Sequence, residues 1–144
     1  DAAEDDIAGG ADSEDGPEAF ALVGIKGFHA GRIVRIQPSD EQKVWTIGRV
    51  DECTISLAGD DEVSSNHSKI SFDRSKQFKL MDLGSTNGTY TSNGQGSTVK
   101  LQKKKNHILK VDHLVTFGST TFKWCFFADA AAIVEQVRAL GVGK

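Results

Sequence analysis

Hydrophobic and polar residues alternate in short runs between residues 20 and 127. The runs Val34–Ile36 and Val44–Ile47 alternate apolar with polar or mixed side chains, which is typical of a strand with one buried face. Proline, glycine, asparagine and aspartate separate the runs at intervals of about ten residues. Many short strands at this spacing predict an all-β fold, an antiparallel β-sandwich.

We predict ten strands from this pattern. They are Phe20–Ile25, Gly31–Ile36, Val44–Ile47, Thr54–Leu57, Lys69–Phe72, Phe78–Leu83, Thr89–Thr91, Thr98–Leu101, His113–Phe117 and Thr120–Phe127. The pair Gly118-Ser119 between the last two runs predicts a two-residue hairpin turn.

The two ends of the chain differ in composition from residues 20–127. Residues 1–19 contain eight acidic residues, no basic one and almost no large apolar side chain, which predicts a disordered acidic tail. It is either a tether or an intramolecular competitor for the rest of the chain. Residues 128–144 form a C-terminal extension in which Asp129 is expected to cap a short α-helix through Leu140, with Gly141 ending it. We expect its apolar stripe to pack on the sandwich.

Composition limits the possible partners. The net charge is −3, but outside residues 1–19 there are 17 basic and 12 acidic residues, so this part favours an anionic ligand. The aromatic residues lie in strand runs and are not interleaved with arginine, so nucleic acid is not the expected partner. No run of 18 apolar residues is present, and a membrane span is not expected. The first residue is Asp rather than Met, which indicates a piece of a longer protein.

Cysteine and histidine give no sign of a metal or cofactor site. Cys53 and Cys125 stand far apart, without a Cys-x-x-Cys spacing, and we expect both to be reduced, half-buried strand residues. The four histidines lack metal-ligand spacing. We therefore expect an intracellular protein, nuclear or cytoplasmic, that is a monomer and binds no metal or cofactor.

Arg49 is the first candidate for ligand binding. It follows Gly48 at the end of a predicted strand, where a glycine lets the backbone turn tightly. A guanidinium presents a planar set of donors that matches two oxygens of a phosphate group. The alternative is a surface arginine paired with Asp51 or Glu52.

Ser64 and His67 lie three residues apart in a polar loop before the strand Lys69–Phe72. The serine hydroxyl can donate to a phosphate oxygen. His67 is interpreted either as a catalytic base for Ser64 or as a hydrogen-bonding brace for the loop, and we favour the brace. Nucleophilic catalysis also needs an orienting third group and an oxyanion hole. The spacing gives no support to Asp82 in that role.

The segment Gly84-Ser85-Thr86-Asn87-Gly88-Thr89 is predicted to be a turn between two strands. Asn-Gly tolerates positive φ and reverses the chain tightly. The Asn87 side chain can both donate to and accept from a peptide backbone, and the Thr86 hydroxyl stands beside it. A plain hairpin connection is the alternative.

The motifs Gly-Arg, Ser-x-x-His and Asp-Leu-Gly-Ser-x-Asn-Gly-Thr occur in this order, with strand-sized gaps between them. Residues 20–127 thereby resemble the forkhead-associated (FHA) domain, a phospho-motif reader. The resemblance implies a sandwich of about eleven strands that binds phosphothreonine peptides through loops at one end. It implies that Arg49, Ser64 and Thr86 contact phosphate, and that Asn87 holds the peptide main chain. It implies structural roles for Gly48, His67, Gly84 and Gly88.

One position departs from the family pattern. Where the family often has Asn, Arg or Lys after the motif serine, this chain has Ser65, with Asn66 or a backbone amide as the other possible contact. The acids Asp60, Asp61 and Glu62 precede Ser64 and predict a negative rim that disfavours acidic ligand residues.

Three hypotheses about function follow. The first is a non-catalytic module that recruits phosphothreonine-containing proteins or peptides. The second is a scaffold of the same fold that binds partners through a sheet face or the C-terminal helix, without phosphate dependence. The third is the regulatory module of a larger signalling enzyme, in which this chain has no active site.

Overall fold

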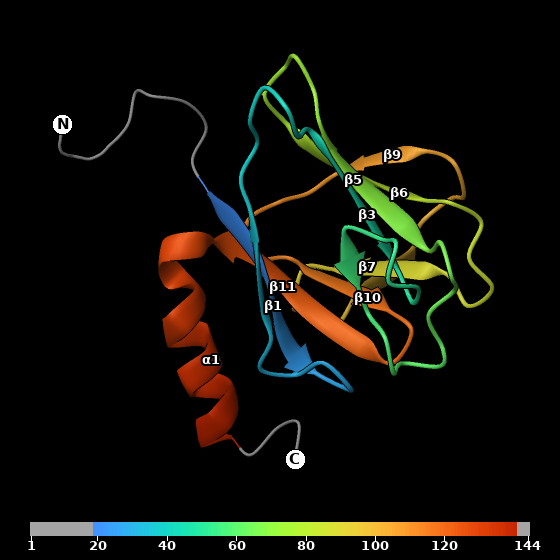
Figure 1. The fold of residues 1–144 in the computed structure, drawn as a ribbon. Coiled ribbons are helices and arrows are strands. Elements are labelled where there is room, and N and C mark those ends of the chain that lie inside the picture. Colours follow the sequence, from blue (N-terminus) through green and yellow to red (C-terminus); the bar gives the residue numbers. More distant parts are fainter. Residues whose placement is uncertain (1–18, 141–144) are drawn as a thin grey trace, which may run out of the picture.

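The computed structural model describes residues 19–140, which form two β-sheets packed face to face with one helix outside (Figure 1). The prediction of a disordered tail thus falls almost wholly outside the described residues, as does Gly141. The elements of the described part are β1 (Phe20–Lys26), β2 (Ile33–Ile36), β3 (Val44–Gly48), β4 (Ile55–Ser56), β5 (Ser68–Phe72), β6 (Phe78–Asp82), β7 (Thr89–Ser92), β8 (Thr98–Lys100), β9 (Asn106–Ile108), β10 (Leu114–Phe117), β11 (Thr120–Phe126) and α1 (Ala130–Ala139).

The two sheets confirm the predicted sandwich. One has six strands in the order β2-β1-β11-β10-β7-β8, and the other has five in the order β4-β3-β5-β6-β9. Neighbouring strands of the described residues are antiparallel except β3 and β4. All ten predicted strands form, with ends that differ by one or two residues. Strand β9 was not predicted, because its three residues follow a lysine run and are too few to show alternation; pairing with β6 makes it a strand.

The core lies between the two sheets. Trp124, Phe117 and Phe122 from the first sheet meet Ile70 and Leu80 from the second, and all five are almost completely buried. Burial of aromatic and aliphatic surface on this scale is the main term that stabilises a sandwich. The loops that leave the strands are therefore held on a rigid frame.

Helix α1 packs on the outer face of the six-stranded sheet, alongside β1 and β11 (Figure 1). Ala130 and Val134 of the helix are buried with Ala21, Val23 and Cys125. A 3₁₀ turn precedes the helix, and Asp129 stands at its N-cap without a side-chain capping bond, which differs from the predicted cap. The packing surface was predicted correctly, and the predicted cap was wrong.

Both cysteines are free and buried, but only Cys125 is in a strand. Cys53 lies in the turn after β3, where its thiol donates to the carbonyl oxygen of Ser65 over 3.3 Å. The prediction of two strand cysteines was therefore wrong for Cys53, because a turn packed against a neighbouring loop buries it.

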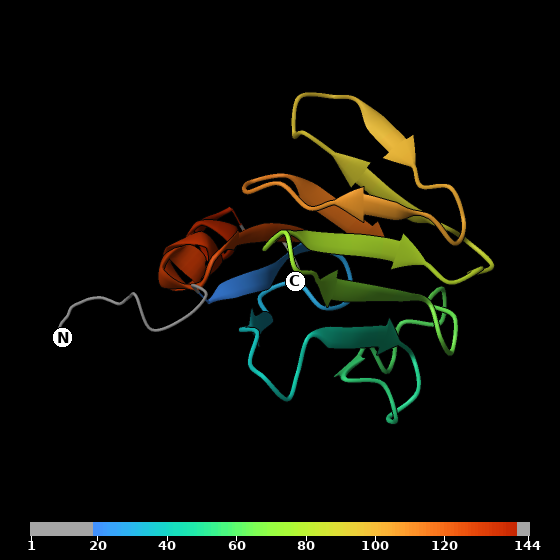
Figure 2. The ribbon, with the colours of Figure 1, turned by 90° about the horizontal axis from the view of Figure 1, so that it is seen from above.

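Strand register brings several loops to one end of the sandwich. Ser68 pairs with Asp82, and Thr89 pairs with Phe117, so β5, β6, β7 and β10 all begin or end there. We call this the loop end; it comprises the segments 49–54, 57–67, 83–88, 101–105 and 118–119, and Figure 2 shows most of them on its right side. The far end comprises the connections 37–43, 73–77, 93–97 and 109–113. The predicted turn 118–119 forms the tight hairpin between β10 and β11.

Candidate functional site

Arg49 leaves the end of β3 toward the loop 57–67. Its backbone N–H donates to the carbonyl oxygen of Ser64 over 3.0 Å, and its guanidinium donates to the hydroxyl of Ser65 over 3.3 Å. A Cβ on Gly48 would collide with the carbonyl oxygen of Ser65, so a glycine is needed for this close approach.

The Arg49 guanidinium is half-buried and has no carboxylate partner in residues 19–140. The alternative of an ion pair with Asp51 or Glu52 is therefore not what these residues show. Ser65 supplies a neutral acceptor that orients the guanidinium, and no carboxylate in the described part of the chain pairs with its charge.

Ser64 connects two loops. Its hydroxyl oxygen accepts from the backbone N–H of Thr86 over 2.9 Å, which leaves the hydroxyl hydrogen to donate elsewhere. Its own backbone N–H donates to Nδ1 of His67 over 3.0 Å. Hydrogen bonds thus fix both the backbone and the side chain of Ser64, while the hydroxyl hydrogen stays available to donate to a ligand.

His67 is completely buried and both of its ring nitrogens are used. Because Nδ1 accepts from Ser64, the proton must be on Nε2, which lies 2.9 Å from the carbonyl oxygen of Gly88 and donates to it. Burial lowers the pKa of His67, so the ring is neutral near pH 7. With no free lone pair the ring cannot serve as a base for Ser64, and it joins the loops 57–67 and 83–88.

Thr86 and Asn87 lie at the exposed tip of the loop 83–88. The Thr86 hydroxyl has no hydrogen-bond partner within the part of the chain that the structure describes. The Asn87 side chain donates one N–H to the carbonyl oxygen of Glu62 over 2.9 Å. Gly84 and Gly88 bracket the tip with φ values of 98° and 89°, which a residue with a side chain rarely adopts.

Asp82 is a buried residue of the site for which the sequence pattern suggested no role. Its carboxylate accepts from the backbone N–H groups of Gly84 and Ser85 over 2.9 and 3.1 Å. It also accepts from the hydroxyls of Ser85 and Thr89 over 2.5 and 2.6 Å. Burial by itself would raise the pKa of Asp82, but these hydrogen bonds lower it, so the group is ionised. The aspartate two residues before Gly84 was the available signal, since aspartate often bonds the backbone two residues on.

Asp60 corrects the predicted acidic rim. It is buried, and its carboxylate accepts from the backbone and hydroxyl of Ser119 over 3.0 and 2.9 Å and from the hydroxyl of Thr120 over 3.0 Å. Burial would raise the pKa of Asp60, but these hydrogen bonds lower it. Only Asp61 and Glu62 remain exposed. No local pattern could predict this bond, because Ser119 is 59 residues away from Asp60.

Three loops therefore present one guanidinium, the hydroxyls of Ser64 and Thr86, and the amide of Asn87. These groups suit the oxygens of a phosphate and a peptide backbone. Within residues 19–140, no group of three or more His, Cys, Asp or Glu could hold a metal ion. No helix in that range has the length and apolar character needed to cross a membrane.

The model of the FHA domain family matches residues 45–118, just over half of the chain. The match contains all three motifs, and the chain belongs to the FHA domain family. No curated protein matches the sequence as a relative.

Solved structures of FHA domains share the fold. The FHA domain of an Arabidopsis thaliana hypothetical protein has 24% identity and a TM-score of 0.65, covering 81% of this chain and 94% of that one. The N-terminal FHA domain of Rad53p from S. cerevisiae, solved with a phosphothreonine peptide, has 24% identity and a TM-score of 0.63, covering 77% and 95%. The FHA domain of MEK1, in complex with a HOP1 phosphothreonine peptide, has 25% identity and a TM-score of 0.54, covering 75% and 96%.

Proposed function

We propose that this chain is a non-catalytic module that binds phosphothreonine-containing proteins or peptides through its loop end. The observation that carries the proposal is the half-buried Arg49 guanidinium, which lies against Ser65 with its charge uncompensated by any carboxylate of residues 19–140. A phosphothreonine carries a charge of about −1.5 to −2 at neutral pH and is the complement of such a site. The phosphothreonine peptides bound by the related Rad53p and MEK1 domains support this ligand class.

Each predicted residue has a role in the proposed complex. Arg49 makes a bidentate contact with the phosphate, and Ser64 and Thr86 donate their hydroxyls to it. Asn87 holds the peptide main chain with the polar atoms that Glu62 does not use. Ser65 orients Arg49, and Gly48, His67, Gly84 and Gly88 fix the loop positions. These four charge-assisted hydrogen bonds, less the cost of ordering the peptide, give an affinity of roughly micromolar order.

Other features agree with a monomeric intracellular recruiting module, either nuclear or cytoplasmic. Cys53 and Cys125 are free, as expected in a reducing compartment. The buried residues of α1 (Ala130, Val134 and Val137) already pack on the sandwich. This leaves less apolar helix surface for the alternative of a scaffold that docks through α1. The proposal gives the chain no enzymatic step of its own, because His67 has no nitrogen free to activate a nucleophile.

The test is a titration of the full chain with a phosphothreonine peptide and its unphosphorylated twin. We expect Arg49→Ala to remove the preference for the phosphorylated peptide while thermal unfolding stays cooperative. Arg49→Lys should bind weakly, since an ammonium cannot make the bidentate contact. The matched control is Arg74→Ala, which removes an exposed arginine from the far end and should leave affinity unchanged. Equal binding of both peptides by the native chain, or undiminished binding by Arg49→Ala, would refute the proposal.

A further inference from the structure

Four exposed lysines border the loop 83–88 on the side away from Arg49. We call them the lysine flank: Lys100, Lys103, Lys104 and Lys105. Lys100 ends β8, and the other three lie in the connection to β9. The sheet edges formed by β8 and β9 place this connection beside the loop 83–88 at the loop end (Figure 2).

Two lysine stems lie against the glycines that bracket Thr86 and Asn87. A Cβ built on Gly88 would be 2.7 Å from Cε of Lys100. A Cβ built on Gly84 would be 3.9 Å from Cε of Lys104, whose backbone N–H donates to the carbonyl oxygen of Asp82 over 2.8 Å. The backbone of Lys103, next to Lys104, forms an isolated parallel β-bridge with that of Asp82. The flank is thus attached to the site loop and does not extend freely into solvent.

No lysine of the flank forms an ion pair with a carboxylate of residues 19–140. The two ion pairs of that range are Lys79 with Asp73 and Arg138 with Glu135, and neither includes a flank lysine. Asp82 is the ionised carboxylate next to the flank; it is buried and accepts hydrogen bonds from Gly84, Ser85 and Thr89, and its single charge does not balance the four lysines. The ammonium groups therefore form a local excess of positive charge beside the tip of the site.

The opposite border of the loop 83–88 carries the reverse charge. There the loop 57–67 brings Asp61 and Glu62, both exposed, next to Asn87 through the bond from Asn87 to the Glu62 carbonyl. Thr86 and Asn87, at the tip of the loop 83–88, thus lie between an acidic border and a basic one. In the proposed complex, a peptide that crosses this loop would meet one border on each side of the tip.

We propose that the lysine flank is a second anion subsite of the phosphopeptide site. Its ligand is an acidic group on one side of the phosphothreonine, either a carboxylate of Asp or Glu or a second phosphorylated residue. This inference rests on the proposed function. It also replaces the general exclusion of acidic ligand residues, predicted from the sequence, with an exclusion on one side only.

The test compares peptides on the full chain. The reference is a phosphothreonine peptide with neutral flanks, chosen from a degenerate library for measurable binding. Glutamate or phosphoserine is then placed at each neighbouring position in turn. We expect a gain of about three- to tenfold for glutamate on one side of the phosphothreonine, and a loss or no change on the other. Phosphoserine should gain more than glutamate because its charge is larger. A larger gain for glutamate than for phosphoserine would identify a carboxylate as the preferred group.

Charge-reversal variants locate the effect. Lys100→Glu with Lys104→Glu should reduce the ratio of acidic to neutral peptide affinity to about one or below. Lys100→Gln with Lys104→Gln keeps much of each stem and tests the charge alone. The matched control is Lys43→Glu with Arg74→Glu, which makes the same change of net charge at the far end and should leave the ratio as it is. In the native chain the gain should shrink as salt rises, since the Debye length falls from about 10 Å at 0.1 M to about 3 Å at 1 M.

The outcomes separate this inference from the proposed function. If the reference peptide binds only when phosphorylated but acidic residues give no gain, or an equal gain on both sides, the lysine flank is not a subsite and the proposed function stands. If the far-end control lowers the ratio as much as the flank variant does, the effect is one of net charge and the inference is wrong. If the reference peptide binds equally without its phosphate, the proposed function itself has failed.

Discussion

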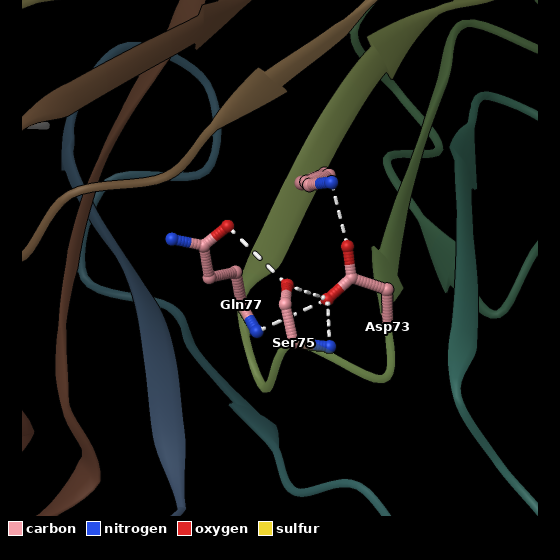
Figure 3. A network of polar contacts seen from close by, with 4 residues as sticks. Asp73, Ser75 and Gln77 are labelled. Atoms are coloured by element: carbon pink, nitrogen blue, oxygen red, sulfur yellow. Dashed lines mark hydrogen bonds and ion pairs between the residues drawn. The ribbon is translucent and has the colours of Figure 1, made fainter.

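The two ends of the sandwich use the same residue types in opposite ways. At the far end, the Asp73 carboxylate accepts from Lys79 over 2.6 Å and from the hydroxyl of Ser75 over 2.5 Å in the turn between β5 and β6 (Figure 3). Backbone N–H groups of Ser75 and Gln77 donate to the same carboxylate over 3.0 and 3.3 Å. The hydrogen bond from Lys79 is the main reason that the pKa of Asp73 is well below its usual value. At the far end, the Lys79 ammonium and the Asp73 carboxylate therefore pair with each other.

At the loop end the carboxylates and the cations do not meet. Asp60 and Asp82 are buried, and their carboxylates accept hydrogen bonds from hydroxyls and backbone N–H groups. Arg49 and the lysine flank keep their charges exposed to a ligand, with no ion pair in residues 19–140. The comparison shows that buried carboxylates can stabilise the loops of a fold while its arginine and lysine side chains stay available to bind a partner. The following predictions test that division.

The largest effect is expected at Asp82. Asp82→Ala removes the acceptor for donors on Gly84, Ser85 and Thr89, and those on Ser85 and Thr89 stay buried, which should lower the free energy of unfolding by about 3 kcal/mol. Chemical denaturation measures the change. Asp73→Ala at the far end removes an equally bonded but more exposed carboxylate and should cost far less. Similar losses for both variants would show that the two ends do not differ in this way.

A smaller loss of stability, together with a loss of phosphopeptide affinity, is expected on substitution of Gly48. Gly48→Ala forces the loop 57–67 away from β3, because the new methyl group collides with the Ser65 backbone, and should cost about 2 kcal/mol of stability. Phosphopeptide affinity should fall as well, since Ser64 and Ser65 move. Gly94→Ala is the control: Gly94 has a φ of 84° but open space around it, so only backbone strain of about 1 kcal/mol is added. An unchanged affinity in Gly48→Ala would contradict the proposed loop arrangement.

Ser64→Ala removes the hydroxyl that accepts from the Thr86 backbone N–H and that, in the proposed complex, donates to the phosphate. We expect phosphopeptide affinity to fall about tenfold, measured by calorimetry, which corresponds to one charge-assisted hydrogen bond. Ser75→Ala removes a hydroxyl from the far-end network and should not change affinity. If the two variants bind alike, Ser64 does not contact the ligand.

The smallest effect is a pH dependence from His67. Its pKa is lowered in the folded chain by burial, whereas the unfolded chain has the ordinary value of 6.5. Above pH 6.5 both states are neutral and stability is unaffected; below it the unfolded chain binds the proton first, so stability falls. Protonation of Nδ1 in the folded chain also breaks the bond from Ser64, so affinity should weaken only at the lower pH where the folded chain itself takes up the proton. His67→Gln should be less stable at all pH values but should lose this slope, as followed by thermal unfolding between pH 5 and 8. A native profile that is flat over that range would contradict the assignment.

Local patterns along the chain determined the architecture. Alternation in runs such as Val44–Ile47 predicted the strands because burial of one sheet face needs a period of two residues. The motifs around Arg49, Ser64 and Asn87 predicted which loops carry the ligand-binding groups, since hydroxyl, amide and guanidinium groups at turns have a chemistry that does not depend on distant residues.

Only the tertiary structure decided how these loops are connected. The bonds of Asp60 to Ser119 and of His67 to Gly88 join residues far apart in the chain, and they follow from sheet order and register. Strand β9 forms because β6 offers it an edge, and the lysine flank borders the site because β8 ends and β9 begins there. The period of hydrophobic residues shows which face of a single strand is buried. Whether two loops come into contact depends on the order and register of all the strands between them.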